Sequence, residues 1–191
     1  MIWECVVTSL SADGRTHIAP MGVREDDGYI IVAPFRPSGT LANLERDGVA
    51  VVNYTDDVRI IAGCLTGRTD WPLLPASRIR GHRLAECLAH TEVELARVEP
   101  DESRPRLYCR ALHTEHHAPF RGFNRAQAAV VEAAILVSRL HMLPRGKIER
   151  EIEYLKIAVD KTAGAREREA WTWLMQRIES FQRDATPERH A

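Results

Sequence analysis

The sequence predicts a mainly β protein, an antiparallel β-barrel followed by a helical extension. Three observations support this fold class. The first 65 residues divide into short runs rich in Val, Ile, Thr and Tyr, separated by Asp-Gly turns. The connections between successive runs are short, which favours a closed antiparallel barrel over a doubly wound sheet. After Phe123 the pattern becomes helical, and 191 residues suffice for one core and a small helical appendage.

Five β-prone runs come first, and Asp13-Gly14 and Asp27-Gly28 are typical hairpin turns between them. The predicted strands cover residues 4–10, 16–23, 28–35, 49–54 and 58–65. Between the third and fourth runs, Leu41 and Leu44 are spaced as on one helix face. We therefore expect a helix of about two turns, with Ser38 or Thr40 at its start and Gly48 as its stop.

The middle of the chain contributes two longer β-prone runs. Residues 66–82 hold prolines and glycines without a steady period, which predicts a loop. Residues 83–99 and 106–117 alternate as strands do, with a polar turn between them. The chain should therefore hold about seven strands.

The last third predicts helices. Asn124 and Gln127 have the spacing of a capping box before a long apolar helix, which ends at Pro144 and Gly146. Apolar residues then recur every three or four positions in two more segments, which predicts two amphipathic helices in an antiparallel hairpin. We expect a barrel domain over 1–122, a helical extension packed on it over 123–185, and a frayed tail over 186–191.

Composition excludes some classes of function. The charged fraction is 28% and the net charge −1, so no overall field favours nucleic acid or an anionic membrane. The first residues lack the basic region of a signal peptide, and no apolar run is long enough to span a bilayer. The four cysteines form no C-x-x-C pair, which favours free thiols and a cytoplasmic location.

Residues 17–23, HIAPMGV, form an irregular strand. Pro20 cannot donate to a sheet, and Gly22 lets another molecule approach the main chain. One interpretation is that the strand offers its backbone to a flat ligand instead of a neighbouring strand. The ordinary interpretation is an edge strand with a bulge.

Residues 34–44, PFRPSGTLANL, suit an anion. Arg36 can donate a forked pair of hydrogen bonds, and Ser38 and Thr40 can donate their hydroxyls. The first N–H groups of the short helix favour an anion at the same place. The ordinary alternative is that a hydroxyl merely caps the helix and Arg36 is solvated. Combined with the irregular strand just upstream, the segment favours a phosphorylated planar ligand.

Two further candidates lie later in the chain. Asn124 and Arg125, at the start of the long helix, can reach a ligand phosphate, although the helix's charges can equally form a solvent-facing stripe. His113, Glu115 and His117 would share one face of a strand and could bind a divalent metal. Their spacing matches no established zinc motif, so a polar strand end is the preferred interpretation.

Four motifs, in the same order, give the chain a family resemblance. They are HIAPMGV (17–23), PFRPSGTLANL (34–44), VVNYTDD (51–57) and FNRAQAAVVEAAILVSR (123–139). Together they resemble the FMN-binding split-barrel superfamily, and within it an uncharacterised flavoprotein-like family, a domain of unknown function, from methanogens and methylotrophic bacteria. The match runs over nearly the whole chain and makes the expected fold a split β-barrel with a C-terminal helical extension.

The resemblance implies a homodimer with two FMN sites at the subunit interface. The backbone of Ala19, Pro20, Met21 and Gly22 would line the isoalloxazine ring, and Arg36, Ser38 and Thr40 would hold the phosphate, with Asn43 in support. Asn53, Asn124 and Arg125 would border the site. His17 stands where many relatives have Asn, and imidazole titrates near neutral pH.

The resemblance also implies a role. The leading hypothesis is an FMN-dependent oxidoreductase acting on a small soluble substrate or an electron donor, linked to pterin-dependent one-carbon metabolism. The first alternative is a non-catalytic carrier of FMN or another phosphorylated planar ligand. The second is a metal-binding protein using His113, Glu115 and His117. No catalytic residue is assigned, because in flavin chemistry the cofactor carries the redox step.

Overall fold

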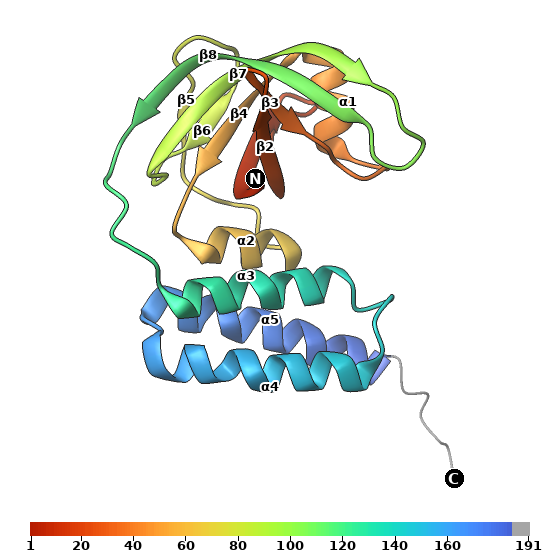
Figure 1. Cartoon of the computed structure of the whole chain (residues 1–191), viewed down its shortest axis with the longest axis vertical. Helices are drawn as coiled ribbons and strands as arrows, with labels where there is room; N and C mark the ends of the chain where they lie inside the picture. Colours follow the sequence, from red (N-terminus) through yellow and green to blue (C-terminus); the bar gives the residue numbers. More distant parts are fainter. Residues whose placement is uncertain (185–191) are drawn as a thin grey trace. The chain divides into compact units, whose positions relative to one another are not determined.

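The structure is a computed structural model that describes residues 1–184, and it forms two compact units (Figure 1). Residues 1–56 and 70–120 make the β unit, and, among the described residues, 57–69 and 121–184 make the helical unit. The predicted boundary at residues 122 and 123 stays a prediction. The expected frayed tail, 186–191, lies outside the described residues.

Six strands of the β unit close an antiparallel barrel in the order β1–β2–β3–β8–β7–β4. Their bounds are β1 Trp3–Leu10, β2 Thr16–Asp26, β3 Tyr29–Val32, β4 Val49–Tyr54, β7 Ala89–Glu99 and β8 Arg106–His116. The barrel interior is filled by aliphatic side chains and two cysteines, among them Val7, Val52 and Val93. The predicted fold class, a mainly β barrel with added helices, is confirmed.

Two further strands cross the outside of the barrel. β5 (Leu73–Pro75) lies in the segment 66–82, expected to be a loop, and pairs with β6 (His82–Leu84). The strand expected over 83–99 is interrupted: its first two residues belong to β6, and β7 begins only at Ala89. Leu84 N–H donates to Asn53 Oδ1 of β4, and His82 O accepts from Thr8 Oγ1 of β1. These bonds hold the β5–β6 hairpin, with its connections, against the barrel wall.

Helix α1 (Gly39–Asp47) is the predicted short helix. The Ser38 hydroxyl accepts from Leu41 N–H at its start, and Gly48 ends it in the left-handed conformation. Leu41 and Leu44 are buried in the barrel core, as their spacing predicts.

Up to residue 184, the helical unit contains four helices (Figure 1). They are α2 Val58–Leu65, α3 Arg125–Ser138, α4 Arg145–Thr162 and α5 Ala165–Asp184. The three helices predicted for this region are present, and α4 and α5 both pack against α3. The strand predicted for residues 58–65 is wrong, because that segment is helix α2, packed on α3 and α5. No helix in the described residues is long and apolar enough to cross a membrane.

The start of α3 confirms half of the capping box. Asn124 Oδ1 accepts from the backbone N–H groups of Ala126 and Gln127. The Gln127 side chain does not return to the cap but donates to Glu167 of α5. The four cysteines are free, as expected; Cys5, Cys87 and Cys109 are buried and Cys64 is half-buried.

Candidate functional site

Strand β2 has one paired edge and one edge that is largely open. On one side it pairs with β1 from Thr16 to Val23, straight through Pro20 and Gly22. The expectation that this strand would forgo a neighbour is therefore wrong on that side. On the other side β2 pairs with β3 only over Val23–Asp26. Within residues 1–184, the 16–22 edge facing β3 has no strand partner, so its main-chain groups are available there.

Gly22 also has a packing reason to be glycine. A Cβ at Gly22 would lie 2.7 Å from Cγ2 of Ile2, closer than two carbons can approach. The side chain of Ile2, which precedes β1, therefore lies directly against the Gly22 backbone. Ala19, Pro20 and Met21 are half-buried, and Met21 packs against the barrel core.

The start of α1 lies beside the beginning of β2. A Cβ at Gly39 would lie 3.1 Å from the ring of His17, so the imidazole rests on the first residue of the helix. Burial lowers the pKa of His17, which keeps the ring neutral at physiological pH. A neutral ring next to the positive end of a helix leaves that end available to an anion.

Thr40 supplies an unusual feature of this helix start. Its side chain is fully buried, and its hydroxyl has no hydrogen-bond partner among the described residues. Leaving a buried hydroxyl unsatisfied costs about 1–3 kcal/mol, so such groups are uncommon and often mark a missing ligand or water. Ser38, by contrast, caps the helix, as the ordinary interpretation predicts.

Arg36 is free to turn toward a ligand. Its guanidinium is 3.8 Å from Glu45 Oε1, and both side chains are nearly half exposed. A pair with that exposure contributes little, so an incoming anion can replace it. The Arg36 backbone N–H donates to Ser103 O, which anchors the main chain of the turn.

Two predicted asparagines are already engaged inside the protein. Asn43 donates to Ser9 Oγ and accepts from Arg46, which ties α1 to the end of β1. Asn53 is fully buried, donating to Val6 O and accepting from Leu84 N–H under the β5–β6 hairpin. The structure therefore brings together His17 and the start of α1, and places Asn53 in a structural network.

Asn124 and Arg125 belong to the helical unit. Besides capping α3, Asn124 donates to Thr162 O, and Arg125 is exposed. Their part in a ligand site stays a prediction.

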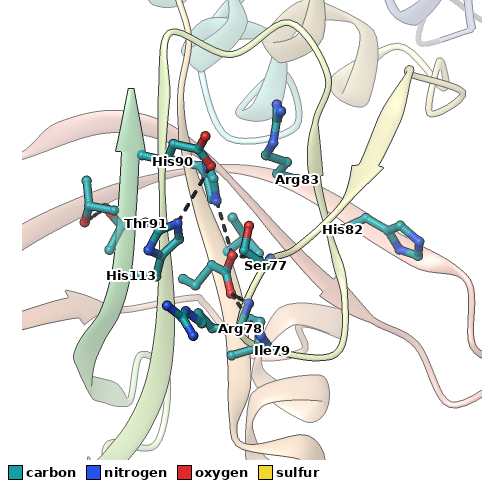
Figure 2. A network of polar contacts seen from close by, with 12 residues as sticks. Ser77, Arg78, Ile79, His82, Arg83, His90, Thr91 and His113 are labelled. Atoms are coloured by element: carbon teal, nitrogen blue, oxygen red, sulfur yellow. Dashed lines mark hydrogen bonds and ion pairs between the residues drawn. The ribbon is translucent and has the colours of Figure 1, made fainter. Parts of the chain in front are cut away.

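A buried polar network on the outer face of β7 was not predicted (Figure 2). His90 and Glu92 are fully buried, and His90 Nε2 lies 3.3 Å from Glu92 Oε1. The Glu92 carboxylate accepts from the backbone N–H groups of Ser77, Arg78 and Ile79. Burial alone would raise the pKa of Glu92, but these donors outweigh it and the pKa is lowered.

The predicted metal set does not converge as proposed. His117 lies with Cys87 and His90, whereas His113 and Glu115 form a separate group that also includes His90. The partner missing from the sequence prediction is His90. The sequence did contain a signal for His90: in a strand, His90 and Glu92 lie on one face and Thr91 and Val93 on the other, so a histidine and a carboxylate are neighbours on the same face.

Two cavities open on the β unit. The larger, about 900 Å³, is lined by the β2–β3 turn and by β7 and β8, with the aromatic rings of Tyr29, Tyr54 and Phe120. The smaller, about 360 Å³, lies at Gly22 and Phe35 and carries Arg24, Arg104 and Arg106. Of the predicted ligand residues, Gly22 alone lines either of these cavities.

The fold and the helix start define a class: a six-stranded barrel with a short helix that begins beside an open strand edge. The chain belongs to the family described as protein of unknown function DUF447. It matches the model of the family's N-terminal domain over residues 3–118 and a second model, described as protein of unknown function (DUF447), over residues 124–176. The family resemblance seen in the four motifs is thereby confirmed.

Solved structures share the fold. The FMN-bound DUF447 protein MM1853 from Methanosarcina mazei is 16% identical, with a TM-score of 0.80 over 92% of this chain and 94% of that one. The 2-nitrobenzoate 2-nitroreductase NbaA of Pseudomonas fluorescens is 20% identical, with a TM-score of 0.51 over 59% of this chain and 64% of that one.

An FMN-binding protein from Thermus thermophilus is 13% identical, with a TM-score of 0.52 over 61% of this chain and 73% of that one. At these identities the likeness shows the fold alone. No curated protein matches the sequence.

Proposed function

We propose that the chain binds FMN at the open edge of β2 and the start of α1, and that it acts as an FMN-dependent oxidoreductase. The observation that carries this proposal is the buried, unpartnered hydroxyl of Thr40 in the first turn of α1. The start of α1 also offers N–H groups and the positive end of the helix dipole. A phosphate there would complete the hydrogen bonding of Thr40.

The residues present fit the cofactor. Arg36 would give a charge-assisted contact to the phosphate, and the open edge of residues 16–22 would meet the polar edge of a flat ring. Gly39, with the His17 ring against it, keeps the approach to the helix start narrow. The FMN-bound relative in the same family supports FMN as the ligand. The flavin would supply the electron transfer, and the protein would supply position and electrostatics.

We further propose that the chain is a homodimer whose second copy covers this site. Three apolar side chains near Gly22 are exposed to solvent: Ile2 is 62% exposed, Trp3 50% and Phe35 63%. Ile2 and Phe35 line the smaller cavity. A molecular mass in solution of twice the 21.6 kDa chain mass would support the dimer, and a monomer at micromolar concentration with FMN bound would contradict it.

Turnover separates the oxidoreductase from a carrier. Under anaerobic conditions, FMN-loaded protein is mixed with NADH or NADPH, and then with candidate acceptors other than oxygen, including pterin-type one-carbon compounds. An oxidoreductase shows loss and return of the yellow absorbance with multiple turnovers. If flavin stays bound but no donor reduces it and no acceptor reoxidises it, the carrier alternative holds.

A further inference from the structure

The network outside the barrel brings three metal-ligating side chains together. Cys87 lies in the turn before β7, His90 lies on β7, and His117 follows the end of β8. One ligand atom from each, the Cys87 Sγ and a ring nitrogen of each histidine, lies within 4.8 Å of the others. Cys87 and His90 are buried and His117 is half-buried. None of the three belongs to the proposed flavin site.

His90 is oriented as metal-binding histidines are. Its Nε2 faces the Glu92 carboxylate. That carboxylate is fixed by the backbone N–H groups of Ser77, Arg78 and Ile79, which are labelled in Figure 2. A carboxylate in this position accepts a hydrogen bond from the N–H of one ring nitrogen and leaves the lone pair of the other nitrogen free. The free nitrogen, Nδ1, faces His117 and lies 2.9 Å from its Nε2. In zinc sites a carboxylate commonly accepts from the ligating histidine in this way and fixes the orientation and tautomer of its ring.

The two histidine rings are joined end to end without an ion. Their planes are within 4° of parallel, and the facing nitrogens are 2.9 Å apart, which is too close for stacked rings. One proton therefore lies between the two nitrogens, and the Cys87 thiol donates to Leu84 O. A metal ion would take the place of both protons: the thiol proton would leave, and the imidazole proton would move to the other nitrogen of the His117 ring.

We propose that Cys87, His90 and His117 bind one divalent transition metal ion of the zinc class, with Glu92 holding His90 in place. When the ion binds, the Cys87 thiol proton is released to solvent, and His117 stays neutral by carrying its proton on Nδ1 instead of Nε2. The two facing nitrogens would move from 2.9 Å to about 3.3 Å apart, as two bonds of about 2.0–2.1 Å at a tetrahedral angle require. The half-buried His117, beyond the last residue of β8, provides that movement.

The competing set, His90 with His113 and Glu115, is less suited. His113 Nε2 lies 3.7 Å from Glu115 Oε2, and both side chains are substantially exposed on β8. One thiolate and two imidazoles also match the preference of zinc better than an exposed carboxylate does. With three protein ligands, one coordination position remains for water or a substrate.

The experiment uses the full chain purified without a metal-affinity column. We expect about one equivalent of zinc by elemental analysis. After zinc is removed by chelation, Co²⁺ is added as the probe. Co²⁺ should bind with one equivalent per chain and give visible bands of a tetrahedral site and a near-ultraviolet thiolate-to-metal band.

Variants assign the ligands. Cys87→Ser should abolish the thiolate band, and His117→Ala should weaken Co²⁺ binding at least tenfold. Cys64→Ser, which changes a half-buried thiol on α2, is the matched control and should bind like the original chain. Substoichiometric metal together with no saturable Co²⁺ spectrum would overturn the proposal. So would a thiolate band that survives in Cys87→Ser. Flavin-free protein is used throughout, so failure here leaves the FMN proposal untouched.

Discussion

At the scale of single residues, the start of α1 carries the account. The Ser38 hydroxyl already caps the helix, whereas the buried Thr40 hydroxyl has no partner among the described residues. The Arg36 guanidinium makes only a long, exposed ion pair with Glu45. The sequence could identify these residue types and the helix start. It could not tell which hydroxyl caps and which is left over, because that depends on how deeply α1 sinks into the core.

Thr40→Val tests the unsatisfied hydroxyl directly. Valine keeps the shape and removes the group, so the flavin-free protein should become more stable by up to about 1 kcal/mol. FMN affinity should fall about tenfold, because a hydrogen bond to a charged group contributes about 1.5–3 kcal/mol. Urea unfolding and a flavin fluorescence titration measure the two effects. Unchanged FMN affinity would remove Thr40 from the site.

Arg36→Ala should weaken FMN binding by tenfold or more, because a charge-assisted phosphate contact is lost. Arg139→Ala, at the exposed C-terminal end of α3, is the matched control and should bind FMN like the original chain. Fluorescence titration of both variants makes the comparison. Equal affinity in the two variants would show that the phosphate lies elsewhere.

Glu92→Gln tests the buried network. The pKa of Glu92 is lowered in the folded protein, so the carboxylate stabilises the fold above its unfolded pKa of about 4.3 and loses that effect as pH falls below it. Urea unfolding with chelator present should show a loss of about 2 kcal/mol at pH 7. The difference in unfolding free energy between Glu92→Gln and the original chain should shrink as the pH is lowered through the folded pKa of Glu92. The exposed control Glu179→Gln should unfold with the same free energy as the original chain at every pH. A loss in Glu92→Gln that does not change with pH would contradict the stabilising role of the Glu92 carboxylate.

At the scale of elements, α2 shows where sequence reasoning failed. Residues 58–65 are rich in β-branched side chains, which locally favours a strand. Yet Val58, Ile61 and Ala62 have helical spacing and are buried, and Asp57 caps the helix by accepting from Arg59 N–H. Packing on α3 and α5 overrides the local preference.

The β5–β6 hairpin was missed for a similar reason. Its strands have three residues each, too few to show an alternating pattern. They are held by contacts to distant residues such as Thr8 and Asn53, which sequence proximity does not reveal. By contrast, α1 was predicted because its cap, apolar spacing and glycine stop are all local signals.

Gly48→Ala tests the helix stop. Gly48 has a φ of 71°, and a Cβ there would meet nothing within 4 Å, so backbone strain is the whole effect. We expect a loss of about 1 kcal/mol, or about 2–4 °C in the thermal midpoint. Gly146→Ala in α4 is the matched control. Its Cβ would make one ordinary contact, to Arg150, so stability should stay level or rise. Equal losses in both variants would contradict the left-handed stop.

At the scale of the whole molecule, the sequence predicted the barrel, the helical region and the family, because these follow from patterns repeated over many residues. The expected division into a barrel over 1–122 and a helical extension over 123–185 stays a prediction. In the structure, α2 groups with the C-terminal helices although it lies within the barrel's stretch of sequence. The proposed cofactor site depends on the β unit placing an open strand edge next to a helix start. That arrangement is the central claim about this molecule.

The measurement that tests the claim most directly is the absorbance spectrum of the purified chain after FMN is added and the sample is passed through gel filtration. The account predicts yellow-flavin peaks that travel with the protein at about one FMN per chain, and much less flavin retained by Thr40→Val and Arg36→Ala. Protein that elutes without flavin after reconstitution would contradict it. The open edge of β2 would then be an ordinary strand edge, and the Thr40 hydroxyl would need another partner.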